Sequence, residues 1–150
     1  MRGAAVVGVL AVLGLATSWG ETTKVVASWK RTPGALNRTV TQRTINSTIC
    51  VHGWTSTIRP PVSYTNRLKL VQMRQYHESG SPSRYEEDHL IPLELGGHPT
   101  SPRNLWPEPR PRAEKTVDRI ETSLKRRVCR GVLTLARGRR RISLLKHSEG

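Results

Sequence analysis

The sequence predicts a small α+β protein of one domain, in which a two-stranded hairpin is followed by an amphipathic helix. Two apolar runs flank the Gly96-Gly97 pair, which is the pattern of two strands joined by a loop. After Pro111, apolar residues recur at intervals of four, three, four and four, at Ala113, Val117, Ile120, Leu124 and Val128. The chain has 150 residues, of which 35% are hydrophobic and none is Phe, so we expect one modest core.

The segments before the hairpin carry weaker patterns. Residues 21–32 are polar without periodicity, which predicts a flexible leader, and the stretch up to Ser47 is predicted to be loop with at most a short helix. Residues 49–54 alternate between less polar and polar side chains, and the Pro60-Pro61 pair that follows soon after would stop a ladder of strand hydrogen bonds. We therefore expect a short N-terminal strand or extended arm there.

Two further helices are predicted to flank the hairpin. The first is capped by Ser63 or Thr65 and runs to about Tyr76, with an apolar stripe that indicates packing against the core. The second is a last helical piece over about residues 133–145, which carries many arginines.

The N-terminus has the pattern of a secretory signal peptide. Its apolar segment, residues 4–16, is shorter than the ~20 apolar residues that span a bilayer, and small residues follow it. We expect cleavage within residues 16–20, so that residues 1–20 are the signal peptide and 21–150 the mature domain. A secreted, periplasmic or cell-envelope location without stable membrane association follows, and an uncleaved membrane anchor is the alternative.

Cys50 and Cys129 are the two cysteines of the chain. An oxidising compartment would allow a disulfide between them, closing a long loop. Neither cysteine lies in a CxxC or Cys/His spacing, so a metal-binding role is disfavoured.

The charge of the chain is strongly basic. Its 25 Lys and Arg residues against 11 Asp and Glu residues give a formal net charge of +14. Such an excess predicts a polyanionic partner, most commonly nucleic acid, although a basic composition also serves solubility alone. The candidate phosphate contacts are Arg103, Arg137, Arg139, Arg140 and Arg141.

Three side chains around the predicted hairpin indicate hydrolytic chemistry. His89 is a candidate general base because imidazole titrates near neutral pH, and Asp88 offers an oxygen ligand for a hard cation. Asn104 opens the second apolar run, where it would fix the loop or orient the imidazole. Because neighbours on a strand point to opposite faces, Asp88 and His89 share one site only where the strand ends or bulges. A purely structural histidine is the alternative.

The segments DHLIPLELGG and NLWPEP resemble the HNH, or ββα-metal, endonucleases, and in particular a group of small secreted bacterial proteins of this type. The likeness extends to SYTNRLK and VCRG and covers roughly residues 32–135. It implies a hairpin and a following helix with a divalent metal ion between them. We expect Mg²⁺, with Mn²⁺ or Zn²⁺ as alternatives.

The resemblance also assigns roles to individual residues. It implies that Asp88 is the first metal ligand, His89 the general base and Asn104 the asparagine that braces the hairpin loop. The family's further ligand, a His or Asn on the following helix, is missing here, and relatives carry a Lys-Asp pair where this chain has Val117-Asp118. Asp118 is the expected second ligand, and the alternatives are Glu114 and Glu108.

These patterns predict a secreted, metal-dependent endonuclease of low sequence specificity that acts on nucleic acid, with DNA the expected substrate. The departure on the helix leaves a second interpretation open, in which a catalytically impaired scaffold only binds nucleic acid. A third is a basic protein held on the acidic polymers of the cell envelope.

Overall fold

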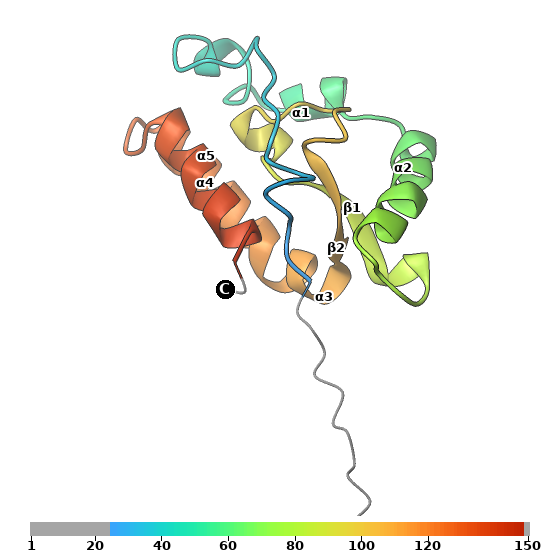
Figure 1. Cartoon of the computed structure of the whole chain (residues 1–150). Helices are drawn as coiled ribbons and strands as arrows, with labels where there is room; N and C mark the ends of the chain where they lie inside the picture. Colours follow the sequence, from blue (N-terminus) through green and yellow to red (C-terminus); the bar gives the residue numbers. More distant parts are fainter. Residues whose placement is uncertain (1–24, 149–150) are drawn as a thin grey trace, which may run out of the picture.

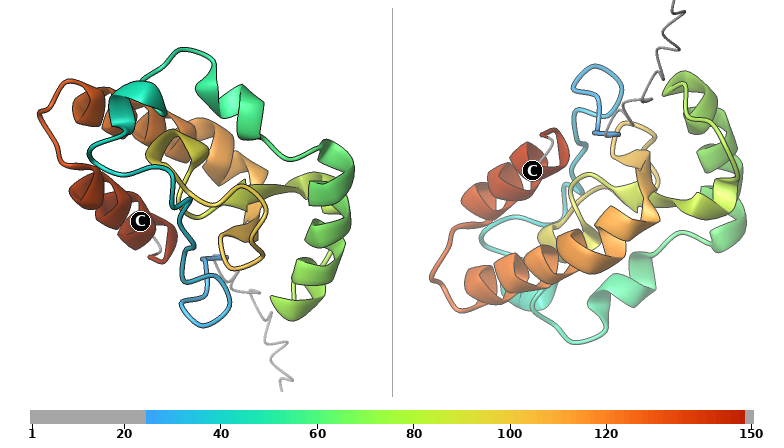
Figure 2. Two further views of the ribbon diagram at one scale, coloured as in Figure 1. Left: turned by 90° about the horizontal axis from the view of Figure 1, so that it is seen from above. Right: turned by 90° about the horizontal axis from the view of Figure 1, so that it is seen from below.

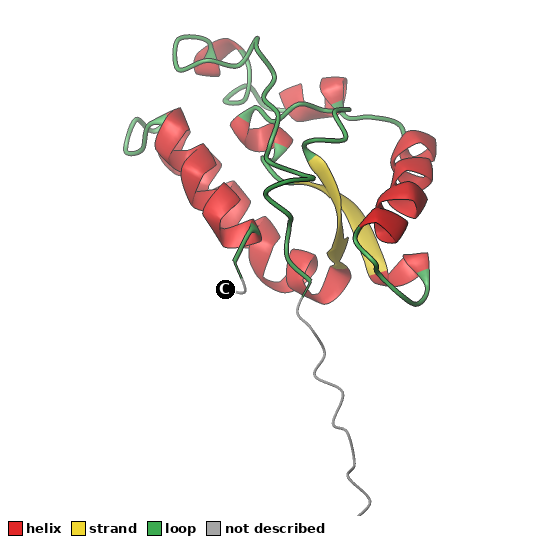
Figure 3. Cartoon of the chain, viewed as in Figure 1, coloured by secondary structure: helices red, strands yellow, loops and turns green. Residues whose placement is uncertain are grey.

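The computed structural model describes residues 25–148, and its mixture of helices with one small sheet confirms the predicted α+β class (Figure 1 and Figure 3). The predicted signal peptide, residues 1–20, lies outside the described residues. No helix within the described range is both long and apolar enough to cross a bilayer.

The predicted hairpin forms, and its second strand coincides with the second apolar run, but its first strand precedes the first apolar run, whose residues 90–95 lie in the loop and a 3-10 turn. Strand β1 (Tyr85–His89) pairs antiparallel with β2 (Leu105–Pro109), in a register that runs from Tyr85 opposite Pro109 to His89 opposite Leu105. Proline is tolerated in β2 because both strands of a two-stranded sheet are edges, where a missing N–H breaks no inner ladder.

The helices are mostly short. They are α1 (Trp54–Ile58), α2 (Val62–Gln75), α3 (Arg110–Arg112), α4 (Asp118–Cys129) and α5 (Leu135–Lys146), and a π-helical turn at Ala113–Val117 joins α3 to α4. Single 3-10 turns occur at Ile45–Ser47, Pro82–Arg84 and Leu93–Leu95. The first of these confirms the expectation of at most a short helix before residue 48.

Helix α2 lies along one side of the hairpin, and α4 and α5 lie on the other (Figure 1 and Figure 2). The main core joins α4 and α5 to the hairpin loop and to the 40–50 segment. Its buried members include Val40, Ile49, Ile91, Leu95, Val117, Leu124, Val128 and Ile142. The repeat of apolar residues that predicts the long helix therefore marks the face that is buried.

The predicted strand at residues 49–54 is wrong. Within the described chain this segment forms turns that lead into α1, and the Cys50 N–H donates to the Ile45 carbonyl, 2.9 Å away. Ile49 is buried and Val51 is 44% exposed. The alternation in the sequence therefore comes from a turn that buries one residue, and no neighbouring strand pairs with it.

The predicted flexible leader also needs correction from residue 25 onward. Ala27 is buried, and its N–H donates to the carbonyl of Lys146 over 2.9 Å. Thr32 is fully buried and donates to the Leu105 carbonyl over 3.2 Å. These long-range contacts fix the segment against β2 and α5; residues 21–24 lie outside the described part.

Helix boundaries differ slightly from those expected. Helix α2 begins at Val62 directly after Pro61, so Ser63 and Thr65 lie inside its first turn instead of capping it. Helix α5 begins two residues later than expected, because Thr134 caps it by accepting a hydrogen bond from the Arg137 N–H.

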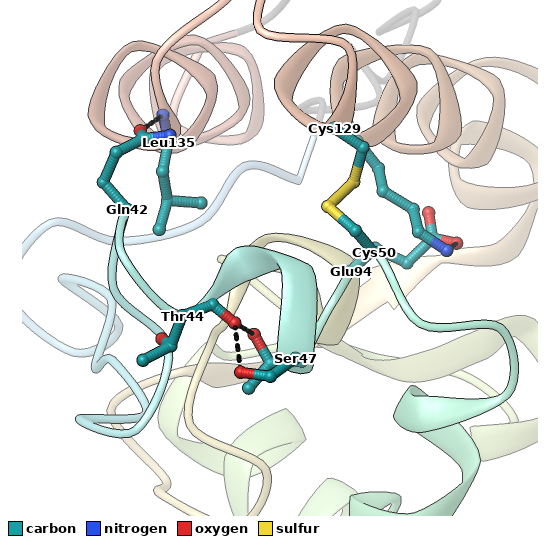
Figure 4. The surroundings of a disulfide bond; sticks show 9 residues. Gln42, Thr44, Ser47, Cys50, Glu94, Cys129 and Leu135 are labelled. Atoms are coloured by element: carbon teal, nitrogen blue, oxygen red, sulfur yellow. Dashed lines mark hydrogen bonds and ion pairs between the residues drawn. A yellow bond between two sulfur atoms is a disulfide. The ribbon is translucent and has the colours of Figure 1, made fainter.

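The disulfide between Cys50 and Cys129 is confirmed, with 5.6 Å between the two Cα atoms (Figure 4). It ties the turn before α1 to the C-terminal end of α4. Nearby, the side chain of Gln42 accepts a hydrogen bond from the Leu135 N–H, so the same N-terminal region also holds the start of α5 (Figure 4).

Candidate active site at the end of the hairpin

His89 is the last residue of β1 and is largely buried. Its Nε2 lies 2.9 Å from the carbonyl oxygen of Pro99 in the hairpin loop. A carbonyl can only accept, so Nε2 carries the proton. Burial lowers the pKa of His89 below its ordinary value, although the Pro99 carbonyl and the Asp88 carboxylate oppose this effect. At neutral pH the ring is therefore neutral, with its lone pair on Nδ1.

Asn104 is fully buried and holds the hairpin loop together. Its Oδ1 accepts from the Ile91 N–H at 3.0 Å, and its Nδ2 donates to the carbonyls of Ile91 and His98 at 3.0 and 3.1 Å. A side chain at Gly97 would overlap the Ile91 carbonyl oxygen, so this position needs glycine. The arrangement is that of a brace, and it fixes the loop whose Pro99 holds His89.

The Asp88 side chain points away from His89, as alternation on a strand requires, and pairs with the ammonium of Lys146 from α5. The Lys146 side chain is completely buried. Its Nζ also lies 2.7 Å from Glu121 Oε1 and 3.7 Å from Glu108 Oε2, and it donates to the His89 carbonyl over 2.6 Å. One lysine thus meets carboxylates from β1, β2 and α4.

The charges in this cluster are strongly shifted. Burial favours the neutral form of Asp88, yet the Lys146 ammonium outweighs it and lowers the pKa of Asp88. Burial, assisted by the charge of Asp88, raises the pKa of Glu108 to about 9. Burial likewise raises the pKa of Glu121 to about 8, although Lys146 opposes it. The carboxylates raise the pKa of Lys146 despite its burial. Glu108 and Glu121 therefore keep their protons to higher pH than free carboxyl groups do, whereas the Asp88 carboxylate pairs with the Lys146 ammonium.

The expected metal does not fit this arrangement. Among residues 25–148, no group of three His, Cys, Asp or Glu side chains is arranged to hold a metal ion. Asp88, the expected first ligand, is engaged by Lys146. Asp118, the expected second ligand, lies exposed at the start of α4. Partial burial, with the charge of Asp88, raises the pKa of Asp118.

Glu108 and Glu114, the alternative ligands, are placed differently from one another. Glu108 is fully buried beside Lys146, whereas the side chain of Glu114 is 58% exposed and pairs with Arg110. Only Glu108 therefore belongs to the cluster around Asp88.

The expected phosphate contacts divide into two kinds. The guanidinium of Arg139 donates to the carbonyls of Leu95 and Val40 over 2.8 and 2.9 Å, so it clamps α5 onto the hairpin loop. Four arginines are exposed and available to a polyanion: Arg103, Arg137, Arg140 and Arg141. We leave Arg139 out of the proposed phosphate contacts because its guanidinium serves the fold.

A surface pocket adjoins the loop that holds His89. Residues 35–38 line one side, among them Arg38, and His98 and Pro99 line the other. The exposed Arg38 side chain therefore stands next to the residue whose carbonyl orients the candidate base.

Lys146 and Glu121 are the site residues that sequence reasoning missed. The buried residues of α5 are Leu135, Gly138, Ile142 and Lys146, at helical spacing. Lys146 therefore occupies the inward face of an amphipathic helix, where a lysine is unusual. That position was a usable signal for a buried cation.

Comparisons of the chain with protein-family models, curated proteins and solved structures find no match. A functional proposal therefore depends on the chemistry of the residues at the end of the hairpin and on the charge of the surface around them.

Glu87 supports a prediction about stability. Both of its carboxyl oxygens are buried and lack a hydrogen-bond partner among the described residues. Burial raises its pKa to about 8, with Lys69 opposing. Because the unfolded chain loses this proton near pH 4.5 and the folded chain only near 8, the folded state becomes less stable as the pH rises between these values. Glu87→Gln should therefore increase the free energy of unfolding, by up to about 3 kcal/mol at pH 7.

Urea unfolding of the wild type and Glu87→Gln at pH 5 and pH 7.5 measures this effect. The gain should be larger at pH 7.5, and an equal gain at both pH values would contradict the titration of a buried carboxyl group. Glu114→Gln, at an exposed side chain, controls for the loss of one negative charge.

Proposed function

We propose that this protein is a secreted endonuclease that hydrolyses phosphodiester bonds with His89 as the general base. The observation that carries the proposal is the fixed, neutral imidazole at the end of β1, whose Nε2 is held by the Pro99 carbonyl. The disulfide and the N-terminal apolar segment are compatible with a secreted protein.

The chemistry follows from the tautomer of His89. With the proton on Nε2, Nδ1 removes a proton from a water molecule as the water oxygen bonds to phosphorus. The phosphorus–oxygen bond to the leaving alcohol breaks, and that oxygen takes a proton from solvent. The Pro99 carbonyl supports the imidazolium that forms because it accepts a hydrogen bond from Nε2–H throughout.

Substrate binding is assigned to charge on the surface. With a net charge of +14, the chain attracts nucleic acid without reading its sequence. Arg38, which lines the pocket beside Pro99, and the exposed Arg103 are the proposed phosphate contacts near the hairpin loop. Low sequence specificity follows, because phosphate contacts are the same for every base, and DNA is the proposed substrate.

A second candidate function is nucleic-acid binding without cleavage. Two observations favour it: His89 is only 6% exposed, and Asp88 is engaged by Lys146. In this case the basic surface binds the backbone and the hairpin serves as a scaffold.

Nicking of supercoiled plasmid by the mature protein separates the two candidates. His89→Ala is expected to reduce the rate of nicking by roughly 10²–10⁴-fold, because it removes the base and leaves the basic surface. A salt-sensitive gel shift should remain unchanged in the variant. His52→Ala, at an exposed residue in the turn before α1, is the matched control and should nick at the wild-type rate.

Each reaction is run with Mg²⁺, with Mn²⁺ and with EDTA. Undiminished nicking by His89→Ala would rule out the assignment of the base. A gel shift without nicking in any of these conditions would establish the binding function instead.

A further inference from the structure

The Lys146 ammonium is surrounded by oxygen atoms. Every contact of its Nζ described above is with oxygen: the carboxylates of Asp88, Glu108 and Glu121 and the carbonyl of His89. Carboxylate and carbonyl oxygens are the ligands that hard divalent cations bind. The lysine thus occupies a point where the fold gathers oxygen atoms around a cation, although with Lys146 in place the described side chains form no group of three that could hold a metal ion.

Glu108 is a further carboxyl group beside Lys146, whereas an ordinary ion pair needs only one. Its side chain is fully buried, and its carboxyl group shares a hydrogen bond with that of Asp88. Arg112 and Lys146 lie 3.7 Å from its oxygens. A fully buried carboxyl group is costly to desolvate, so its place beside the Asp88–Lys146 ion pair requires an explanation beyond packing.

Lys146 also reaches the backbone of the candidate base. It donates to the carbonyl oxygen of His89, and through Asp88 it holds the preceding residue of β1. The end of the strand that carries the imidazole is therefore fixed from α5 as well as from the Pro99 loop.

We infer that Lys146 is the resident cation of the Asp88–Glu108–Glu121 centre and takes the place of a divalent metal there. Lys146 is a positioning residue, because its buried side chain cannot touch a substrate. If Lys146 replaces the metal ion, plasmid nicking should continue in EDTA. This expectation about nicking rests on the proposed hydrolysis.

Titration with Mn²⁺, followed by thermal unfolding, tests the inference without any cleavage assay. The melting temperature of the wild type should not respond to Mn²⁺ at this centre. Lys146→Ala removes the ammonium, leaves three carboxyl groups and opens space between them; Asp88 and Glu121 provide access, with side chains 16% and 12% exposed. Its melting temperature should be lower than that of the wild type and should rise by about 5 °C in millimolar Mn²⁺.

Lys69→Ala is the matched control. Lys69 is also a buried lysine whose Nζ donates to a carbonyl of β1, that of Tyr85. Of the carboxyl groups with raised pKa values described above, only Glu87 is influenced by Lys69. Loss of the Lys69 side chain therefore leaves no set of three carboxyl ligands. The control should be destabilised without any recovery in Mn²⁺.

Two results would overturn the inference. One is saturable Mn²⁺ binding by the wild type that Asp88→Asn abolishes. The other is a folded Lys146→Ala variant that does not respond to Mn²⁺. Should Lys146→Ala fail to fold, Lys146→Met keeps the three carboxyl groups, fills part of the space with an apolar side chain and gives the same comparison. An absence of plasmid nicking would count against the proposed hydrolysis. The Mn²⁺ titration would still test the inference about Lys146.

Discussion

Replacement of both Cys50 and Cys129 by Ser is expected to lower the free energy of unfolding by about 4–5 kcal/mol. The bridge joins residues 79 positions apart, and a cross-link over so long a loop strongly restricts the unfolded chain. The core formed by the 40–50 segment and α4 depends on this bridge, since the segment contains no long helix or strand of its own. Urea unfolding of the wild type and the double variant measures the difference.

Reduction provides the control. A reducing agent should lower the stability of the wild type to that of the double Ser variant and leave the variant unchanged. Two free thiols in the intact mass of the protein produced in an oxidising compartment, or a wild type whose stability does not change on reduction, would contradict the prediction.

Replacement of Asn104 by Ala is expected to lower the free energy of unfolding by about 3–5 kcal/mol, because it removes the partner of two buried backbone groups and of one part-buried group, and each loss costs about 1–3 kcal/mol. These groups are the N–H and carbonyl of Ile91 and the carbonyl of His98. The loop between β1 and β2 should then lose protection in amide hydrogen exchange, and nicking should fall because Pro99 no longer holds His89 in place.

Asn37→Ala is the matched control for this variant. Asn37 also uses its amide oxygen as an acceptor, but its partners are the N–H and hydroxyl of its near neighbour Thr39 at the surface. Its loss should cost no more than about 1 kcal/mol. A similar cost for the two variants would show that the brace adds nothing beyond a surface turn.

Much of the framework is readable from local patterns. The second apolar run after Gly96-Gly97 predicts β2, while β1 ends just before the first apolar run, and the spacing of residues 113–128 predicts the buried face of the long helix. The disulfide follows from the count of cysteines, since two can pair in only one way. These features depend on residues close in sequence or on simple counting, so the chain displays them directly.

Other predictions failed because contacts with residues far away in the sequence decided the local structure. The alternation at residues 49–54 belongs to a turn anchored by the buried Ile49, and the polar leader is fixed by contacts with Lys146 and Leu105 far along the chain. Arg139 looked like a surface charge, yet its donors meet carbonyls of the hairpin loop. Nothing near these residues in sequence indicates such partners.

The sequence by itself determined the α+β class, the hairpin, the long amphipathic helix, the basic charge and the pairing of the two cysteines. Only the tertiary structure decided what surrounds the candidate base: Lys146 lies 58 residues from Asp88 and meets it through the packing of α5 against the hairpin. The physical reason is that an ion pair between distant residues depends on the angle and position at which helices pack. Periodicity fixes which face of a helix is buried, but it does not fix which side chains meet there.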